Sequence, residues 1–149
     1  MNNKINVLLV CSPYYKKITD NLIKGACDIL NSNSVNFKIL HVPGALEIGP
    51  AIKLTLDKSI EKPLFDGFIA LGCVIKGETY HFEIVSNESS RYLTDLSLIH
   101  SIPIGNGILT VTNEDQAIKR SDPMQLNKGA DAALACLSLI NIKNSSKYE

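Results

Sequence analysis

Apolar segments of two kinds alternate along this chain. Residues 5–11 and 68–75 are continuous runs rich in Val, Ile and Leu, and residues 35–42 and 102–111 are further strand patterns. Between them, apolar residues recur every three or four positions, as in helices with one buried face. Strands that are apolar on both faces and alternate with such helices indicate a parallel sheet covered on two sides. The sequence therefore predicts an α/β fold, a three-layer sandwich in which helices flank both faces of a central four-stranded parallel sheet.

The helix patterns follow the strand patterns in turn. We expect helices over residues 18–30, 45–57, 81–100, 113–120 and 127–141. Pro50 fits only near the first turns of its helix, since proline cannot donate an interior backbone hydrogen bond. Asn113 with Gln116 three residues later resembles a helix-capping pair, and we expect the polar tail 144–149 to be frayed. At 149 residues the chain is predicted to form one domain, residues 1–149.

The charge balance gives no sign of a polyanionic partner. Fifteen Lys and Arg balance fifteen Asp and Glu without a polybasic cluster, so we expect no nucleic acid and no membrane partner. The lightly charged surface favours self-association. No apolar run approaches the ~20 residues that span a bilayer, and the first residues show no secretion pattern. The four cysteines are widely separated, and we expect buried thiols in a reducing cytoplasm rather than a metal or redox site.

Ligands of such folds bind outside the carboxyl ends of the strands. One strand end leads through residues 72–81 (GCVIKGETYH) into a helix, and backbone N–H groups at a helix start favour an anion such as phosphate. Thr79 adds a hydroxyl donor. His81 is either a surface histidine of the first helical turn or a general acid/base beside the bound anion.

Residues in three other segments could each have either a structural or a functional role. Glu47 either complements a helix dipole or accepts hydrogen bonds from a polyhydroxy or amine substrate. Tyr14 and Tyr15 either fill the core, or one of them stacks on a flat heterocycle. Arg120 and Lys128 are either solvated charges or a clamp for a phosphate presented by a neighbouring element or subunit.

Four ordered motifs span the chain. They are residues 42–48 (VPGALEI), residues 71–83 (LGCVIKGETYHFE), residues 107–110 (GILT) with Glu114, Gln116 and Arg120, and residues 127–129 (NKG). In this order and spacing they resemble the 6,7-dimethyl-8-ribityllumazine synthases over essentially the whole chain. The resemblance implies a flavodoxin-like fold and a transferase of riboflavin biosynthesis that acts at its penultimate step. That enzyme condenses 5-amino-6-(D-ribitylamino)uracil with 3,4-dihydroxy-2-butanone 4-phosphate, releases phosphate and water, and needs no metal or organic cofactor.

The resemblance also implies roles for single residues. The catalytic group comprises the proton-transfer histidine and two cations: His81, Arg120 and Lys128. The phosphate is held at Glu78, Thr79 and Arg120, and we expect the Glu78 side chain to point away from it. Tyr14 stacks on the pyrimidinedione. The other substrate-binding positions line the ring and the ribityl chain, largely through backbone groups: Ala45, Leu46, Glu47, Cys73, Val74, Ile75 and Asn106.

The implied assembly is a homo-oligomer with shared active sites. In the family, Asn106, Arg120 and Lys128 face the rest of the site across a subunit boundary, the basic unit is a homopentamer, and riboflavin synthase is a suggested partner. This sequence departs from the family at Tyr14, where Phe or Trp is usual, and at Tyr15, where Asn is commoner. The alternative function is a non-catalytic flavin- or lumazine-binding shell protein on the same scaffold. A flavodoxin-like electron carrier is a third hypothesis, which the lack of excess acidic charge disfavours.

Overall fold

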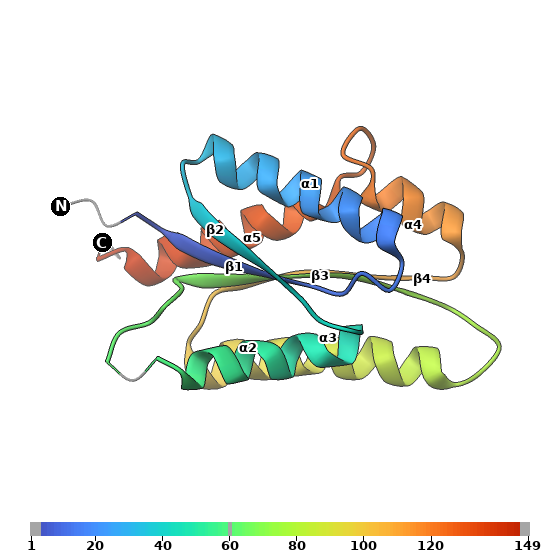
Figure 1. Ribbon diagram of the computed structural model, residues 1–149, viewed down its shortest axis with the longest axis horizontal. Helices are drawn as coiled ribbons and strands as arrows, with labels where there is room; N and C mark the ends of the chain where they lie inside the picture. The colour runs from blue at the N-terminus through green and yellow to red at the C-terminus, as the bar shows by residue number, and fades with distance from the viewer. Residues whose placement is uncertain (1–3, 60, 147–149) are drawn as a thin grey trace.

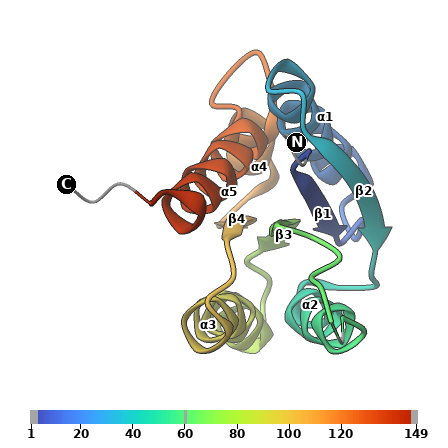
Figure 2. The same ribbon diagram turned by 90° about the vertical axis from the view of Figure 1, so that its left-hand side faces the viewer.

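The computed structural model describes residues 4–59 and 61–146. Over these ranges β1 (Asn6–Cys11), β2 (Asn36–His41), β3 (Gly67–Ile75) and β4 (Ile104–Val111) form one sheet in the order β2-β1-β3-β4, and each neighbouring pair is parallel. Helices α1 (Lys16–Ser32), α4 (Glu114–Ser121) and α5 (Lys128–Asn144) cover one face of the sheet, and α2 (Ile48–Asp57) and α3 (His81–His100) cover the other (Figures 1 and 2). The predicted three-layer α/β sandwich is confirmed.

The two central strands divide their apolar side chains between two cores. Successive side chains of a strand point to opposite faces, so Val7 and Leu9 of β1 join the core beneath α1 and α5, whereas Leu8 and Val10 join the core against α2 and α3. Leu9 lies opposite Ile69 of β3 in the parallel register. Continuous apolar strands are therefore needed here, because both faces of β1 and β3 are covered by helices.

The edge strand β2 is more exposed than the central strands β1 and β3. It pairs with β1 alone, and Ile39 and Leu40 remain 40% and 38% exposed. The reason lies in the strand order, because an edge position leaves one side of the strand without a neighbour. The predicted strand over residues 35–42 is confirmed in its position in the chain.

The predicted helices are present with small differences at their ends. A short 3-10 turn (Ala45–Glu47) precedes α2, and Pro50 lies in the first turn of α2, as expected. The Asn113 side chain accepts the Gln116 N–H at 2.9 Å and caps α4. Helix α5 continues to Asn144, three residues beyond the predicted end, so the tail is shorter than expected and residues 147–149 lie outside the described residues. Within the described ranges, no helix is both long enough and apolar enough to cross a membrane.

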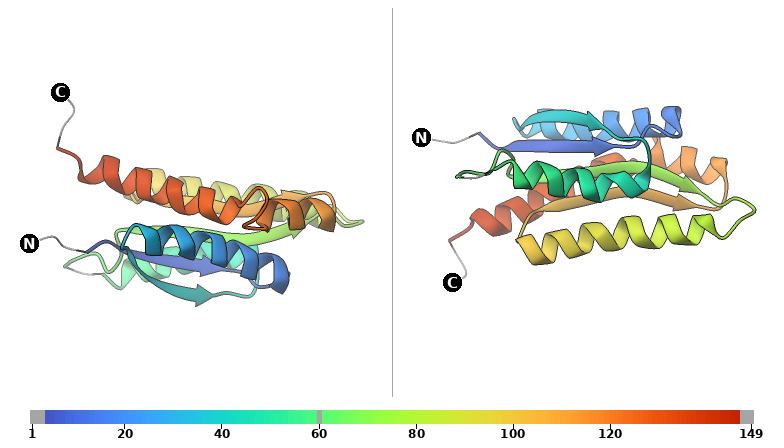
Figure 3. Two further views of the ribbon diagram at one scale, coloured as in Figure 1. Left: turned by 90° about the horizontal axis from the view of Figure 1, so that it is seen from above. Right: turned by 60° about the horizontal axis from the view of Figure 1, so that its bottom comes forward.

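Helices α1 and α5 pack closely side by side (Figure 3). A Cβ atom at Gly129 would lie 2.1 Å from the Leu22 carbonyl oxygen, and one at Gly25 would lie 2.1 Å from Asn127 Oδ1. Asn127 adopts the left-handed conformation, with φ of 48°, immediately before α5 begins. This close crossing determines where α5 starts and hence where Lys128 lies.

Candidate active site

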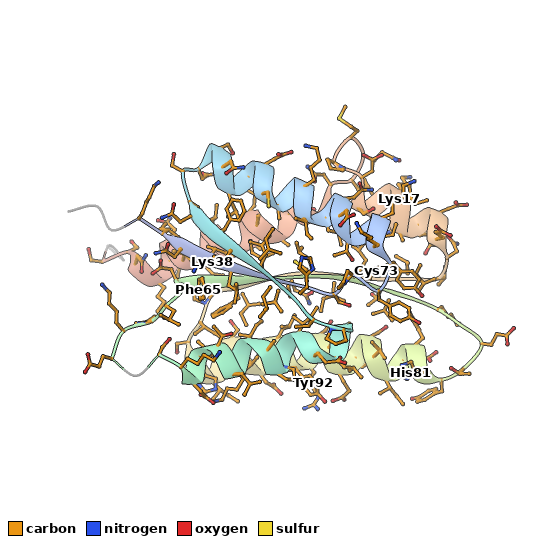
Figure 4. The ribbon with its side chains drawn as sticks, viewed as in Figure 1. Lys17, Lys38, Phe65, Cys73, His81 and Tyr92 are labelled. Atoms are coloured by element: carbon orange, nitrogen blue, oxygen red, sulfur yellow. The ribbon has the colours of Figure 1, made fainter. Side chains whose placement is uncertain are left out.

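A cavity of about 420 Å³ lies at the carboxyl ends of β1 and β3. Figure 4 shows Cys73 near the end of β3 and His81 on the first turn of α3 at this same end of the molecule. Nine residues predicted from the sequence line it: Tyr14, Ala45, Leu46, Glu47, Cys73, Val74, Ile75, Thr79 and His81. We call it the strand-end cavity. The parallel sheet brings these residues together because the segments that follow its strands meet at one edge.

The loop after β1 forms one wall of this cavity. Its first residue, Ser12, is fixed at both backbone groups: its N–H donates to the Leu71 carbonyl at 2.9 Å, and its carbonyl accepts the buried Thr19 hydroxyl at 2.7 Å. Tyr14 and Tyr15 follow, with ring centroids 5.1 Å apart in an edge-to-face arrangement. The wall therefore presents two aromatic rings on a loop that the sheet and α1 hold in place.

A carboxylate and a helix start form the opposite part of the cavity. Glu47 lies in the 3-10 turn, its N–H donates to the Gly44 carbonyl at 3.1 Å, and its carboxylate folds back beside Gly44. At the start of α3, no side chain caps the helix within the part of the chain that the structure describes, which leaves backbone donors for an anion. Thr79 and His81 line the cavity there, whereas Glu78 is exposed and does not line it, in agreement with a side chain that points elsewhere.

The Cys73 thiol and the Tyr15 hydroxyl in the cavity wall stay protonated at neutral pH. Burial raises the pKa of the Cys73 thiol to about 12, so it is no nucleophile. Burial also raises the pKa of Tyr15, and the nearby Tyr14, Cys73 and Glu114 raise it further. This part of the wall therefore offers an uncharged surface to a flat ring, and Glu47 and His81 line the same cavity.

The remaining predicted residues lie in a second cleft of about 450 Å³, between β4 and the helices α4 and α5. Here Asn106 accepts the Ile108 N–H at 3.0 Å. Arg120 takes part in none of the salt bridges among the described residues, and its Nη1 donates to a main-chain carbonyl of α4 at 3.3 Å. Lys128 pairs with Asp131 at 3.0 Å in an exposed position, where an ion pair contributes little. This cation-lined cleft is thus open to an anion.

Within one chain the two cavities share no lining residue. Sequence reasoning missed Val85, Asp131, Ala132 and Ala135, which also line them. Asp131 is three residues from Lys128, so its position alone could have indicated it. A further cavity of about 500 Å³ lies at the opposite end of the sheet, lined by the ends of α2 and α3 and by residues 61–66, and contains none of the predicted site residues.

No three His, Cys, Asp or Glu side chains converge to hold a metal ion in residues 4–59 and 61–146. Comparison with known families gives a direct match: the model of the 6,7-dimethyl-8-ribityllumazine synthases matches residues 4–144. The chain belongs to the lumazine synthase family. The matched range includes both cavities, so every predicted site residue falls within the lumazine synthase match.

Individual lumazine synthases resemble this chain along most of their length. The 6,7-dimethyl-8-ribityllumazine synthase of Bartonella tribocorum is 48% identical over 143 residues, which are 96% of this chain and 93% of the relative. That of Agrobacterium fabrum is 47% identical over 142 residues, 95% of this chain and 96% of the relative. That of Afipia carboxidovorans is 50% identical over 139 residues, 92% of this chain and 85% of the relative.

Proposed function

We propose that this protein is a lumazine synthase that condenses 5-amino-6-(D-ribitylamino)uracil with 3,4-dihydroxy-2-butanone 4-phosphate. Membership of the family supports this reaction. The observation that carries the proposal is the pairing of two different cavities at one sheet. One is a cavity with aromatic rings, a carboxylate and a histidine, and the other is a cleft with Arg120 and Lys128. The first cavity fits a flat ring with a polyhydroxylated chain, and the cleft fits a phosphate ester.

The first step joins the two substrates. The 5-amino group of the pyrimidinedione attacks the ketone carbon, and a water molecule leaves to form an imine. Tyr14 stacks on the pyrimidinedione, and Glu47 accepts hydrogen bonds from the ribityl hydroxyls at the cavity edge. Holding both substrates in register supplies much of the acceleration, because a bimolecular condensation becomes effectively unimolecular.

The later steps release phosphate and close the second ring. A proton leaves carbon as the C–O bond to phosphate breaks, and phosphate takes the electron pair of that bond. Donors at the start of α3, the Thr79 hydroxyl and the Arg120 guanidinium stabilise the departing charge. The enol left by this elimination takes up a proton at its terminal carbon and becomes a ketone. The ribitylamino nitrogen then attacks this carbonyl carbon, and a second water molecule leaves. His81, on the first turn of α3, accepts and returns protons in these steps.

We propose further that a complete site forms between two copies of the chain. Arg120 and Lys128 line a different cavity from His81 in the same chain, so a neighbour's cleft facing the strand-end cavity would unite them. Helices α3 and α5 carry exposed apolar side chains that could be buried in such a contact: Ile84, Leu98, Ile99, Leu134, Leu139 and Ile142. We propose a homopentamer of single-domain chains as the basic unit, working in the cytoplasm with riboflavin synthase as partner.

The alternative, a non-catalytic shell protein that binds flavin or lumazine, has less support. A protein that only binds the product has no need of a phosphate site, yet Thr79, His81, Arg120 and Lys128 are all present. The curated relatives are named as synthases. Both observations favour catalysis.

The test is lumazine formation, followed by absorbance after the two substrates are mixed. We expect turnover by the wild type, loss of at least about a hundredfold in kcat/KM for Arg120→Ala, and a smaller loss for His81→Ala. Arg91→Ala is the matched control, because Arg91 is the other arginine of the chain, pairs with Glu88 on the exposed surface of α3 and lines neither cavity. No turnover by the wild type with the two authentic substrates would refute the proposed function.

A further inference from the structure

The Tyr14 ring lies at the mouth of the strand-end cavity and is 75% exposed. A side chain this exposed has rotamer freedom, and stacking on a ligand removes that freedom at a cost in affinity. Contacts that orient the ring before the ligand arrives reduce this cost. The affinity of the cavity for a flat ring therefore depends on what holds Tyr14.

Tyr15 supplies such a contact. The two ring planes meet at 74° with their centroids 5.1 Å apart, the edge-to-face arrangement that the ring quadrupoles favour. Because the planes are nearly perpendicular, Tyr15 leaves at least one face of Tyr14 free. A flat heterocycle can thus stack on Tyr14 without displacing Tyr15.

Tyr15 is itself anchored to the body of the protein. Its side chain is half-buried and packs against the core beneath α1. Its carbonyl accepts the Thr19 N–H at 3.0 Å, in the first turn of α1. The preceding loop is tied down at Ser12, whose carbonyl accepts the Thr19 hydroxyl. The Tyr15 side chain is therefore held in place by the core, whereas the Tyr14 ring is exposed and contacts the Tyr15 ring.

We infer that Tyr15 is a positioning residue, whose ring holds Tyr14 in the orientation that stacks on the pyrimidinedione. This inference rests on the proposed function, which supplies the flat substrate. Because Tyr15 acts through Tyr14, its effect falls on binding of the pyrimidinedione and not on binding of the phosphate ester. The ring of Tyr15, rather than its hydroxyl, carries the effect.

The test is a double-mutant cycle with titration calorimetry of the pyrimidinedione alone, followed by KM and kcat for both substrates. Tyr15→Leu is expected to weaken pyrimidinedione binding about two- to tenfold, the range for an aromatic pair. Tyr15→Phe keeps the ring and should stay within about twofold of the wild type. In a Tyr14→Leu background, Tyr15→Leu should add less than about twofold. Both kcat and the KM of the phosphate ester should be unchanged in Tyr15→Leu.

Four results would overturn the inference. Equal losses in Tyr15→Phe and Tyr15→Leu would assign the effect to the hydroxyl, and an undiminished loss in the Tyr14→Leu background would make it independent of Tyr14. A rise in both KM values with a lower melting temperature would show a merely structural role. A wild type that makes no lumazine refutes the proposed function, whereas an active wild type with an unaffected Tyr15→Leu variant refutes only the positioning role.

Discussion

Replacing Gly129 by alanine is expected to force α1 and α5 apart. The added Cβ would lie 2.1 Å from the carbonyl oxygen of Leu22 and 2.8 and 2.9 Å from its carbonyl carbon and Cα. These are backbone atoms inside α1, so no side-chain rotation relieves the contact. Overpacking a buried site costs about 1–3 kcal/mol, and a backbone contact belongs at the upper end. Alanine recovers at most ~1 kcal/mol through helix propensity, which leaves a net loss of about 2 kcal/mol.

Thermal unfolding at matched protein concentration measures this loss. For a chain of this size, 1 kcal/mol lowers the melting temperature by about 2–4 °C, so we expect Gly129→Ala to melt about 4–8 °C below the wild type. Gly77→Ala is the matched control, because a Cβ there meets no atom within 4 Å, and its stability should stay within about 0.5 kcal/mol of the wild type. A Gly129→Ala protein that melts at or above the wild-type temperature would refute the close-contact argument.

Three further predictions concern the supports of the two cavities. Asn113→Ala removes the cap that accepts the Gln116 N–H and should lower the unfolding free energy by about 1 kcal/mol in urea; an unchanged midpoint would contradict the capping role. Thr19→Val leaves the Ser12 carbonyl without its hydroxyl donor and should cost about 1–3 kcal/mol in the same assay, whereas a neutral effect would show that this bond does not hold the loop. Because the native pKa of Cys73 is raised from 9.0 to about 12, the unfolded chain loses this proton first and stability falls as pH rises from 9 to 12. Cys73→Ala should make that fall shallower by about 1.4 kcal/mol per pH unit, and an identical slope in both proteins would refute the assigned burial.

Much of the fold could be predicted because its signals are local. The helical pattern over residues 81–100 and the strand pattern over residues 68–75 lie in the chain where the structure places α3 and β3. The exposure of Ile39 and Leu40 could not be predicted in this way, because it depends on the position of β2 at the sheet edge. Strand order is a property of the whole sheet, and the residue pattern of a six-residue strand does not indicate it.

Some residues of the candidate site could likewise be grouped from local sequence signals, whereas the placement of others depends on the packing of the whole fold. Tyr14, Glu47 and His81 follow strands or begin helices at one sheet edge, so the rule for parallel sheets was enough to group them. Residue patterns could not tell whether Arg120 and Lys128 join that group or lie apart, because this depends on how α4 and α5 pack against β4. Only the family resemblance indicated a separate position, and the structure places both cations in their own cleft.

Mixed assemblies of two inactive variants test whether two copies of the chain complete one active site. One chain carries Arg120→Ala, and the other carries His81→Ala with Glu47→Ala; each alone should be nearly inactive. Co-expressed with different tags and purified through both, they should regain about a quarter of wild-type activity, since one quarter of the interfaces in a randomly mixed ring unite an intact cavity with an intact cleft. Mixed assemblies that contain both chains and remain as inactive as the parents would contradict a shared site.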